Sequence, residues 1–264
     1  SVVVSIAIAV MFRTYWAIIL GLAAGGLVQL ILSYTLRPYA PRLTLAGAKE
    51  VLSFSGWLFG VSIITALNNK LDMFVVARAM TPAETGLYSV GCQFAELPTS
   101  EIAVPIARAV YPGLSALQGD HDRVTSAYLR GVEALAAIAL PAAFGLSFVA
   151  RDAVPLLLGS QWIETIPIVQ LVTPALGFQA MFLATYYYAL ALGKARLVFF
   201  RELAYFVLRF PPFTYAAFVY GLKGAVYAAA AMGFIRVALN LLVYAQASGR
   251  RFWEPFWRAR RAIA

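Results

Sequence analysis

Cysteine and histidine are almost absent: the 264 residues include one of each, Cys92 and His121. A single thiol excludes an intramolecular disulfide and any cysteine-based zinc or iron–sulfur site within one copy of the chain. His121 lies in the short polar stretch Gly119–Asp122, so we interpret it as a solvated loop residue, with a metal ligand or catalytic base as the alternative. No P-loop or glycine-rich phosphate motif is present, which excludes an ATP-driven function for this chain alone. We therefore expect neither an enzyme nor a cofactor.

Charge is also scarce. Charged residues make up 12% of the chain and apolar residues 62%, whereas an ordinary soluble domain has roughly 25% and 45–50%. The mean hydropathy is +0.77, and water could not solvate the surface of a protein with so many apolar residues. A bilayer core of about 30 Å needs roughly 20 apolar residues per helix, and stretches of that length recur along the chain. The sequence therefore predicts an all-α fold, a polytopic transmembrane helical bundle.

The hydrophobic stretches are separated by short breaks that contain glycine, proline or charged residues. About eight segments are expected: 1–12, 15–36, 50–78, 84–110, 124–149, 164–192, 196–219 and 223–247. The polar connection 37–49 separates the first two segments from the last six, and we interpret it as a domain boundary. The basic, aromatic tail 248–264 suits either an interfacial helix on anionic lipid or a frayed terminus.

The net charge of +9 does not indicate a nucleic-acid partner, because the basic residues lie between hydrophobic segments and not on one patch interleaved with aromatic residues. Basic residues collect in the cytoplasmic connections of membrane proteins. Alternate connections divide them fourteen to four. One side has Arg37, Arg42, Lys49, Arg108, Arg123, Arg130, Lys194, Arg196, Arg201 and the five arginines of the tail, and the other has Arg13, Arg78, Arg151 and Lys223. This distribution predicts a cytoplasmic C-terminus.

A polar stripe follows one face of the segment 50–78. Its members recur at spacings of seven, three, four and three residues: Ser55, Ser62, Thr65, Asn69 and Asp72. Asn68 flanks this stripe. Lys70 is about 200° around the helix from Asp72, so the two do not pair directly. Polar and charged groups at membrane depth are costly, so such residues usually face a bundle interior or a watered cavity.

Two later segments carry further polar groups. Gln93 and Glu96 share a face of the segment 84–110, while Arg236 and Asn240 share a face of the last segment, and Arg209 lies just before Pro211. Arginine stays protonated and presents a planar fork of donors, so arginines that face a cavity suit phosphate or diphosphate. The alternative is an internal ion pair, for instance Arg236 or Lys70 with Asp72 or Glu96. We expect the set to line a substrate cavity, with Asp72 and Glu96 as candidate sites of ion coupling.

Several short motifs occur in a characteristic order. They are Phe54-Ser55-Gly56-Trp57, Asn68-Asn69-Lys70-Leu71-Asp72, Gly86-Leu87-Tyr88, Tyr111-Pro112-Gly113-Leu114-Ser115 with Leu117-Gln118, Gly159 with Trp162, and Ala191-Leu192-Gly193-Lys194. From about Pro41 onward the chain resembles the second lobe of bacterial polysaccharide and lipopolysaccharide O-antigen flippases, in the multidrug/oligosaccharidyl-lipid/polysaccharide exporter superfamily.

The resemblance implies two helical lobes around a central cavity, with Asn68, Asn69 and Asp72 on a cavity-lining helix. It implies transport of a lipid-linked oligosaccharide of the polyprenyl diphosphate type across the bacterial inner membrane by alternating access, coupled to an ion gradient. Membrane lipids and polysaccharide polymerase or assembly proteins are the partners it suggests. Residues 1–36 then correspond to the last two helices of a first lobe, 37–49 to a cytoplasmic linker and 50–247 to the second lobe. The rest of the first lobe is expected to be truncated or supplied by a partner copy.

Two alternatives to a flippase are an exporter with a different substrate and a membrane-embedded enzyme. A drug or cation exporter of the same superfamily has the same fold, and a cavity lined by carboxylates and aromatic residues without arginine would favour it. A membrane-embedded glycosyl- or acyltransferase needs clustered His, Asp or Glu in a large aqueous loop, and the predicted connections are short and poor in these residues.

Overall fold

The computed structural model describes residues 16–36, 48–117 and 119–263, and every regular element in these ranges is helical. The chain divides into two compact units, residues 1–48 and 49–264. The described element of the first unit is α2 (Trp16–Leu36), which corresponds to the predicted segment 15–36. The predicted segment 1–12 and nearly all of the connection 37–49 lie outside the described residues. The all-α fold is confirmed.

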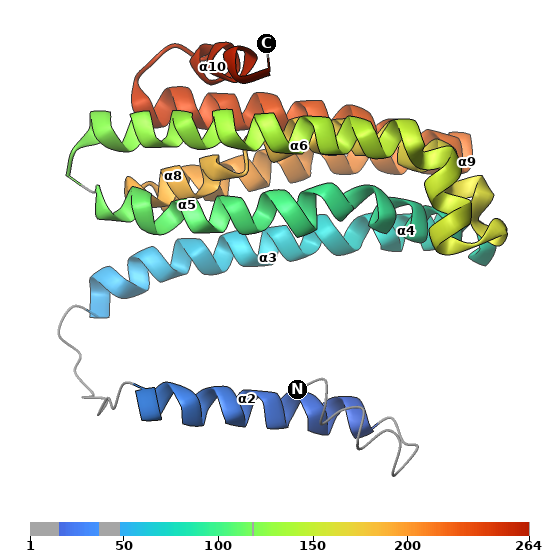
Figure 1. Cartoon of the computed structure of the whole chain (residues 1–264), viewed down its shortest axis with the longest axis horizontal. Helices are drawn as coiled ribbons and strands as arrows, with labels where there is room; N and C mark the ends of the chain where they lie inside the picture. The colour runs from blue at the N-terminus through green and yellow to red at the C-terminus, as the bar shows by residue number, and fades with distance from the viewer. Residues whose placement is uncertain (1–15, 37–47, 118, 264) are drawn as a thin grey trace. The chain divides into compact units, whose positions relative to one another are not determined.

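The second unit contains the remaining helices. In chain order they are α3 (Ala48–Ala79), α4 (Pro82–Leu97), the π-helix η1 (Pro98–Ala103), α5 (Val104–Ala116), α6 (His121–Leu158), the 3₁₀-helix η2 (Ser160–Thr165), α7 (Ile166–Ala180), α8 (Ala184–Ala191), α9 (Ala195–Ser248) and α10 (Glu254–Ile263). α9 folds back on itself at Gly221, whose φ of 60° and ψ of −147° are not helical, and Figure 1 shows its two arms side by side. The six predicted segments between 50 and 247 thus correspond to α3, α4–α5, α6, α7–α8 and the two arms of α9.

Length and composition fit a membrane for most of this unit. Four helical stretches are long and apolar enough to cross a bilayer, namely 55–79, 121–158, 160–191 and 195–248, and the last includes two predicted segments. Large apolar side chains face outward on these helices, among them Phe148, Leu156 and Phe218. The predicted segment 84–110 is helical throughout, but it is not among these four stretches.

The helix ends form where the sequence provides caps. Thr81 and Glu84 make a capping box at the start of α4: the Thr81 amide donates to the Glu84 carboxylate at 3.0 Å, and the Glu84 amide donates to the Thr81 hydroxyl at 3.3 Å. Asp120 accepts from the Arg123 amide at 3.0 Å and caps α6. α6 ends at Gly159, whose φ of 97° favours glycine. These ends agree with the predicted breaks.

One aromatic cluster holds α6, α8 and α9 together. Tyr128, Tyr188 and Tyr244 are completely buried. The ring centroid of Tyr128 lies 4.5 Å from that of Tyr188 and 5.4 Å from that of Tyr244. The hydroxyls are satisfied by threonines: Tyr128 pairs with Thr185 and Tyr188 with Thr125, each at 2.9 Å. The cluster joins three helices that are distant in the sequence.

α10 packs against α6 and continues the same network. The Tyr244 hydroxyl donates to Glu254 at 2.7 Å, and Arg250 pairs with Asp122 at 2.7 Å. The hydrogen bond to Asp122 raises the pKa of the Arg250 guanidinium above its usual value. In the described part of the tail, residues 254–263 are helical, and Glu254 and Arg258 pair with Tyr244 and Glu133.

Candidate functional site

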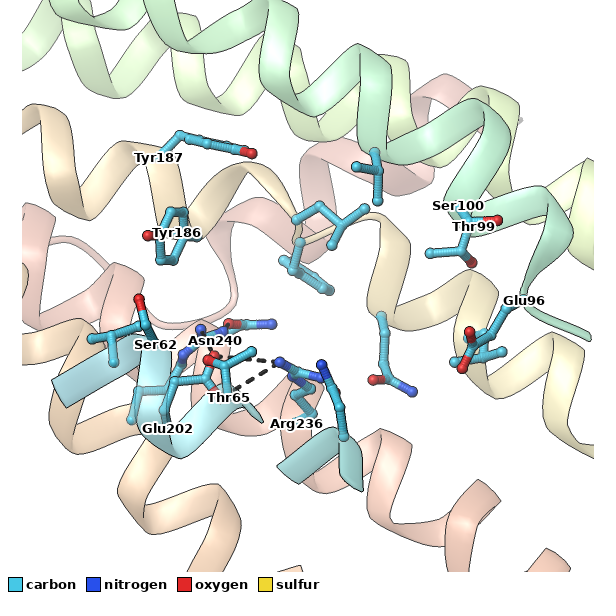
Figure 2. A pocket seen from close by; sticks show the side chains of 18 of the residues that line it. Ser62, Thr65, Glu96, Thr99, Ser100, Tyr186, Tyr187, Glu202, Arg236 and Asn240 are labelled. Atoms are coloured by element: carbon cyan, nitrogen blue, oxygen red, sulfur yellow. Dashed lines mark hydrogen bonds and ion pairs between the residues drawn. The ribbon is translucent and has the colours of Figure 1, made fainter. Parts of the chain in front are cut away.

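A cavity of about 720 Å³ lies inside the second unit, where α3, the α4–η1–α5 segment, the α7–α8 segment and α9 converge (Figure 2). Its lining is apolar in part, with Val61, Leu176 and Leu183, but polar and charged groups come from every side. These groups are Ser62, Thr65, Asn69, Glu96, Thr99, Ser100, Gln179, Tyr186, Tyr187, Arg201, Glu202, Arg236 and Asn240. Such a density of polar groups inside an apolar bundle marks this cavity as the candidate site.

The charged wall of the cavity is built by the two arms of α9. Glu202, on the first arm, forms ion pairs with its neighbour Arg201 and with Arg236 of the second arm, the latter at 3.3 Å. Arg201 also donates to the side-chain oxygen of Asn240. The side chains of Arg201 and Glu202 are only 8% and 4% exposed, whereas that of Arg236 is 27% exposed. Two guanidinium groups thus share one carboxylate, which leaves a positive charge facing the cavity.

The same network extends to α3 through an aromatic ring. The guanidinium carbons of Arg236 and Arg209 lie 4.9 and 5.3 Å from the ring centroid of Tyr205, within the range of a cation–π interaction. Arg209 also forms an ion pair with Asp72 of α3. Glu202, Tyr205 and Arg209 are spaced three and four residues apart, so one face of the first arm carries the whole row. The Asp72–Arg209 pair ties α3 to α9 beside the cavity.

The opposite wall comes from the α4–η1 junction, and Figure 2 shows Glu96, Thr99 and Ser100 there, across the cavity from Glu202 and Asn240. Pro98 begins the π-helix, in which the backbone bonds run to the fifth residue instead of the fourth. The wider turn places Thr99 and Ser100 on the cavity as neighbours of Glu96. π-Helical turns of this kind are frequent at functional sites.

The tyrosine run 186–188 divides between the cavity and the core. Tyr186 and Tyr187 line the cavity, and their rings meet edge to face at a centroid distance of 5.2 Å. Tyr188 points into the buried cluster with Tyr128. Two of the three rings are therefore positioned to stack on a ligand, and the third has a structural role.

The structure brings together some of the residues expected from the sequence. Asn69, Glu96, Arg236 and Asn240 line the cavity, and Asp72 and Arg209 pair with each other beside it. The alternative of an internal ion pair holds for Arg236 and Asp72, but with other partners than those named: Arg236 pairs with Glu202, and Asp72 pairs with Arg209.

Besides Asp72 and Arg209, three expected residues do not line the cavity. Asn68 is buried, one residue and about 100° around the helix from Asn69, and its amide nitrogen has no hydrogen-bond partner within the described residues. Lys70 is exposed and lies about 100° around α3 from Asn69 in the other direction. Gln93 is exposed one turn before Glu96, and its amide donates to Ser89 at 3.0 Å.

Two central residues were missed. Arg201 was counted with the cytoplasmic connections although its side chain is buried, and Glu202 was not considered. The signal was present: Glu202 and Arg209 are charged residues inside an apolar segment, seven residues apart and therefore on one helical face. As for metals, no group of three or more His, Cys, Asp or Glu residues in the described ranges is arranged to hold an ion.

The fold and the cavity define the class: a multi-pass helical membrane protein with a polar, charge-lined cavity in its interior. Residues 1–167 match the family described as polysaccharide biosynthesis protein, and the chain belongs to this family.

Curated relatives agree with this assignment. The chain is 31% identical over 135 residues to the lipopolysaccharide biosynthesis protein WzxC of Escherichia coli (strain K12), which covers 50% of this chain and 27% of that protein. It is 25% identical over 178 residues to the succinoglycan biosynthesis transport protein ExoT of Rhizobium meliloti (strain 1021), and this match covers 66% of this chain and 36% of that protein. The teichuronic acid biosynthesis protein TuaB of Bacillus subtilis (strain 168) is 22% identical over 124 residues, a match that covers 47% of this chain and 26% of that protein. The chain thus spans about a third or less of these relatives, and no solved structure matches it.

Proposed function

We propose that this chain is part of a flippase that moves lipid-linked oligosaccharide or polysaccharide precursors across the bacterial inner membrane by alternating access. The observation that carries the proposal is the shared carboxylate: Arg201 and Arg236 together exceed the charge of Glu202 and leave a cationic wall in a cavity of about 720 Å³. Arginine binds phosphate oxygens through two parallel hydrogen bonds, which suits the diphosphate of a polyprenyl-linked substrate. The names of the relatives, in lipopolysaccharide and succinoglycan biosynthesis, support the same substrate class.

The composition of the cavity also separates this proposal from a drug exporter. A cationic drug would be repelled by the arginine wall, and of the two carboxylates that line the cavity Glu202 is already paired, which leaves Glu96 on the opposite wall. Tyr186 and Tyr187 offer aromatic faces next to the arginines, and sugar rings stack on such faces. A glycan attached to a diphosphate would meet both kinds of group in the same cavity.

Coupling and orientation complete the proposal. Glu96 faces the cavity from the wall opposite Arg236, and Asp72 pairs with Arg209 at its edge, so both are candidates for coupling to an ion gradient. The unit 49–264 acts as the second lobe, and the end of the bundle with α10 faces the cytoplasm, as the excess of basic residues indicates. A reporter that is active only in the cytoplasm, fused after α10, tests this orientation, and we expect it to be active. If only a reporter that works in the periplasm is active at this position, the orientation is the reverse.

The experiment that tests transport is polysaccharide export in a strain that lacks its own flippase, complemented with the full-length protein. Arg236→Gln keeps a polar side chain and removes its charge, and we expect it to reduce export about 100-fold while the protein still inserts. Asp72→Asn tests the neighbouring pair, and we expect export to be lost as well. The matched control is Arg151→Gln, which removes an exposed arginine of α6 that does not line the cavity. Normal export by both Arg236→Gln and Asp72→Asn would rule out the proposal.

A further inference from the structure

The two arginines that share Glu202 are not held equally. Arg201 is nearly buried, and it is bonded both to Glu202 and to Asn240. Arg236 reaches the two oxygens of Glu202 at 3.3 and 3.5 Å, distances at the long end of a charged hydrogen bond, and a quarter of its side chain is exposed to the cavity. Arg201 is therefore fixed, whereas Arg236 can change partners.

Loss of the contact between Arg236 and Glu202 would leave no buried charge without a partner. Glu202 would keep Arg201, and the removal of every partner from a buried carboxylate is the costly event. Arg236 would keep the face of Tyr205, 4.9 Å from its guanidinium carbon, which holds the group at the cavity wall. The local structure thus provides a position for Arg236 with and without Glu202.

We propose that Glu202 is a built-in competitor of the anionic ligand: a diphosphate binds Arg236 by displacing the Glu202 carboxylate, which stays on Arg201. The inference rests on the proposed function and deepens it. A carboxylate presents two oxygens to a guanidinium group, as a phosphate does, and both contacts of Glu202 use Nη2 of Arg236, so Glu202 occupies this donor when the cavity contains no anion. The competition lowers the affinity for the substrate, and a transporter must also release what it binds.

Two substitutions at Glu202 weaken the competitor in different ways. Glu202→Gln removes its charge. Glu202→Asp keeps the charge but shortens the side chain by one methylene, so the carboxylate can stay with the adjacent Arg201 and no longer reaches Arg236 at 3.3 Å. Because the aspartate still neutralises Arg201, Glu202→Asp keeps the test decisive if Glu202→Gln fails to fold. Glu101→Gln is the matched control, since Glu101 is exposed on η1 and does not line the cavity.

The measurement is the binding of inorganic diphosphate to the purified full-length protein in detergent, by titration calorimetry. We expect both Glu202 variants to bind diphosphate about tenfold more tightly than the unchanged protein, the value for gaining one charge-assisted contact, while Glu101→Gln leaves binding as it was and Arg236→Gln abolishes it. If diphosphate binds measurably only to the Glu202 variants, the competition is stronger still and the inference stands.

The opposite results separate the inference from the proposed function. Unchanged or weaker binding by Glu202→Asp, with binding still lost in Arg236→Gln, overturns the competition and leaves the anion site intact. No binding by any variant, with export still blocked by Arg236→Gln, also overturns the inference alone. No binding by any variant together with normal export by Arg236→Gln and Asp72→Asn overturns both.

Discussion

Two regions of the same bundle use charged side chains in opposite ways. Around the cavity, Arg201 and Glu202 are enclosed by the arms of α9, and each has a partner within the network. At the α10 end, Arg250 pairs with an Asp122 carboxylate that is 83% exposed. The chemistry of the two pairs is the same, but water screens only the second. Burial therefore decides whether a pair is a structural necessity or a minor contact.

The interior pair should show the largest effect on stability. Arg201→Ala removes the guanidinium that neutralises Glu202 most closely, and it also leaves the Asn240 oxygen without its donor. We expect a loss of about 3 kcal/mol in the free energy of unfolding, near the lower end for breaking a buried pair because Arg236 still neutralises part of the charge. The measurement is unfolding by a denaturing detergent in mixed micelles.

Arg123→Ala is the control for this experiment, because Arg123 has an exposed side chain and a distant partner, Asp120 at 4.0 Å. If the two alanine variants unfold at the same detergent concentration, burial does not determine how much each arginine contributes to stability, and the contrast between the two regions fails.

A buried hydrogen bond without charge should lie between the two extremes. Tyr128→Phe removes a hydroxyl that pairs with Thr185 at 2.9 Å in the aromatic cluster and leaves the threonine hydroxyl buried without it. We expect a loss of about 1–2 kcal/mol, the usual range for one such group. Tyr215→Phe, on an exposed tyrosine of α9, serves as the control and should change nothing measurable. An effect as large as that of Arg201→Ala would show that burial matters and charge does not.

The exposed pair at the α10 end should show the smallest effect. A double-mutant cycle with Arg250→Ala and Asp122→Ala isolates the interaction, and we expect a coupling energy of about 0.2–1 kcal/mol that decreases as salt is added. The cycle is measured by the same unfolding assay at two salt concentrations. A coupling above about 2 kcal/mol, insensitive to salt, would mean that α10 is held as firmly as the interior network.

The path of the chain could be predicted almost completely from the sequence. Apolar runs of membrane length and the breaks at Thr81–Pro82, Gly159 and Gly221 predicted the helices, because hydrophobic length and glycine or proline punctuation act locally. The π-helix at Pro98–Ala103 was not predicted. A proline in a helical segment is compatible with a kink, a π-turn or a new helix start, and neighbouring helices decide among them.

The candidate site could be predicted only in part. Helical spacing correctly placed Arg236 and Asn240 on one face and Asn69 on the face of α3 that lines the cavity. It could not say that Glu202 would meet Arg236, because the two lie on different arms of α9 and their contact depends on how the arms are rotated about their axes. The same limit explains why Lys70 and Gln93 were included: a polar residue inside an apolar segment can face either the cavity or the outside.

The sequence by itself determined that this protein is a helical membrane bundle and where its chain turns, since the transfer of apolar residues from water into a bilayer depends on each segment alone. Only the tertiary structure decided which charges meet. A buried charge is tolerated where an opposite charge or a hydrogen-bond donor comes within about 3–4 Å, and that distance is set by the packing of helices far apart in the sequence. The cavity, with two arginines on one carboxylate, exists only because α3, the α4–η1–α5 segment, the α7–α8 segment and both arms of α9 converge around it.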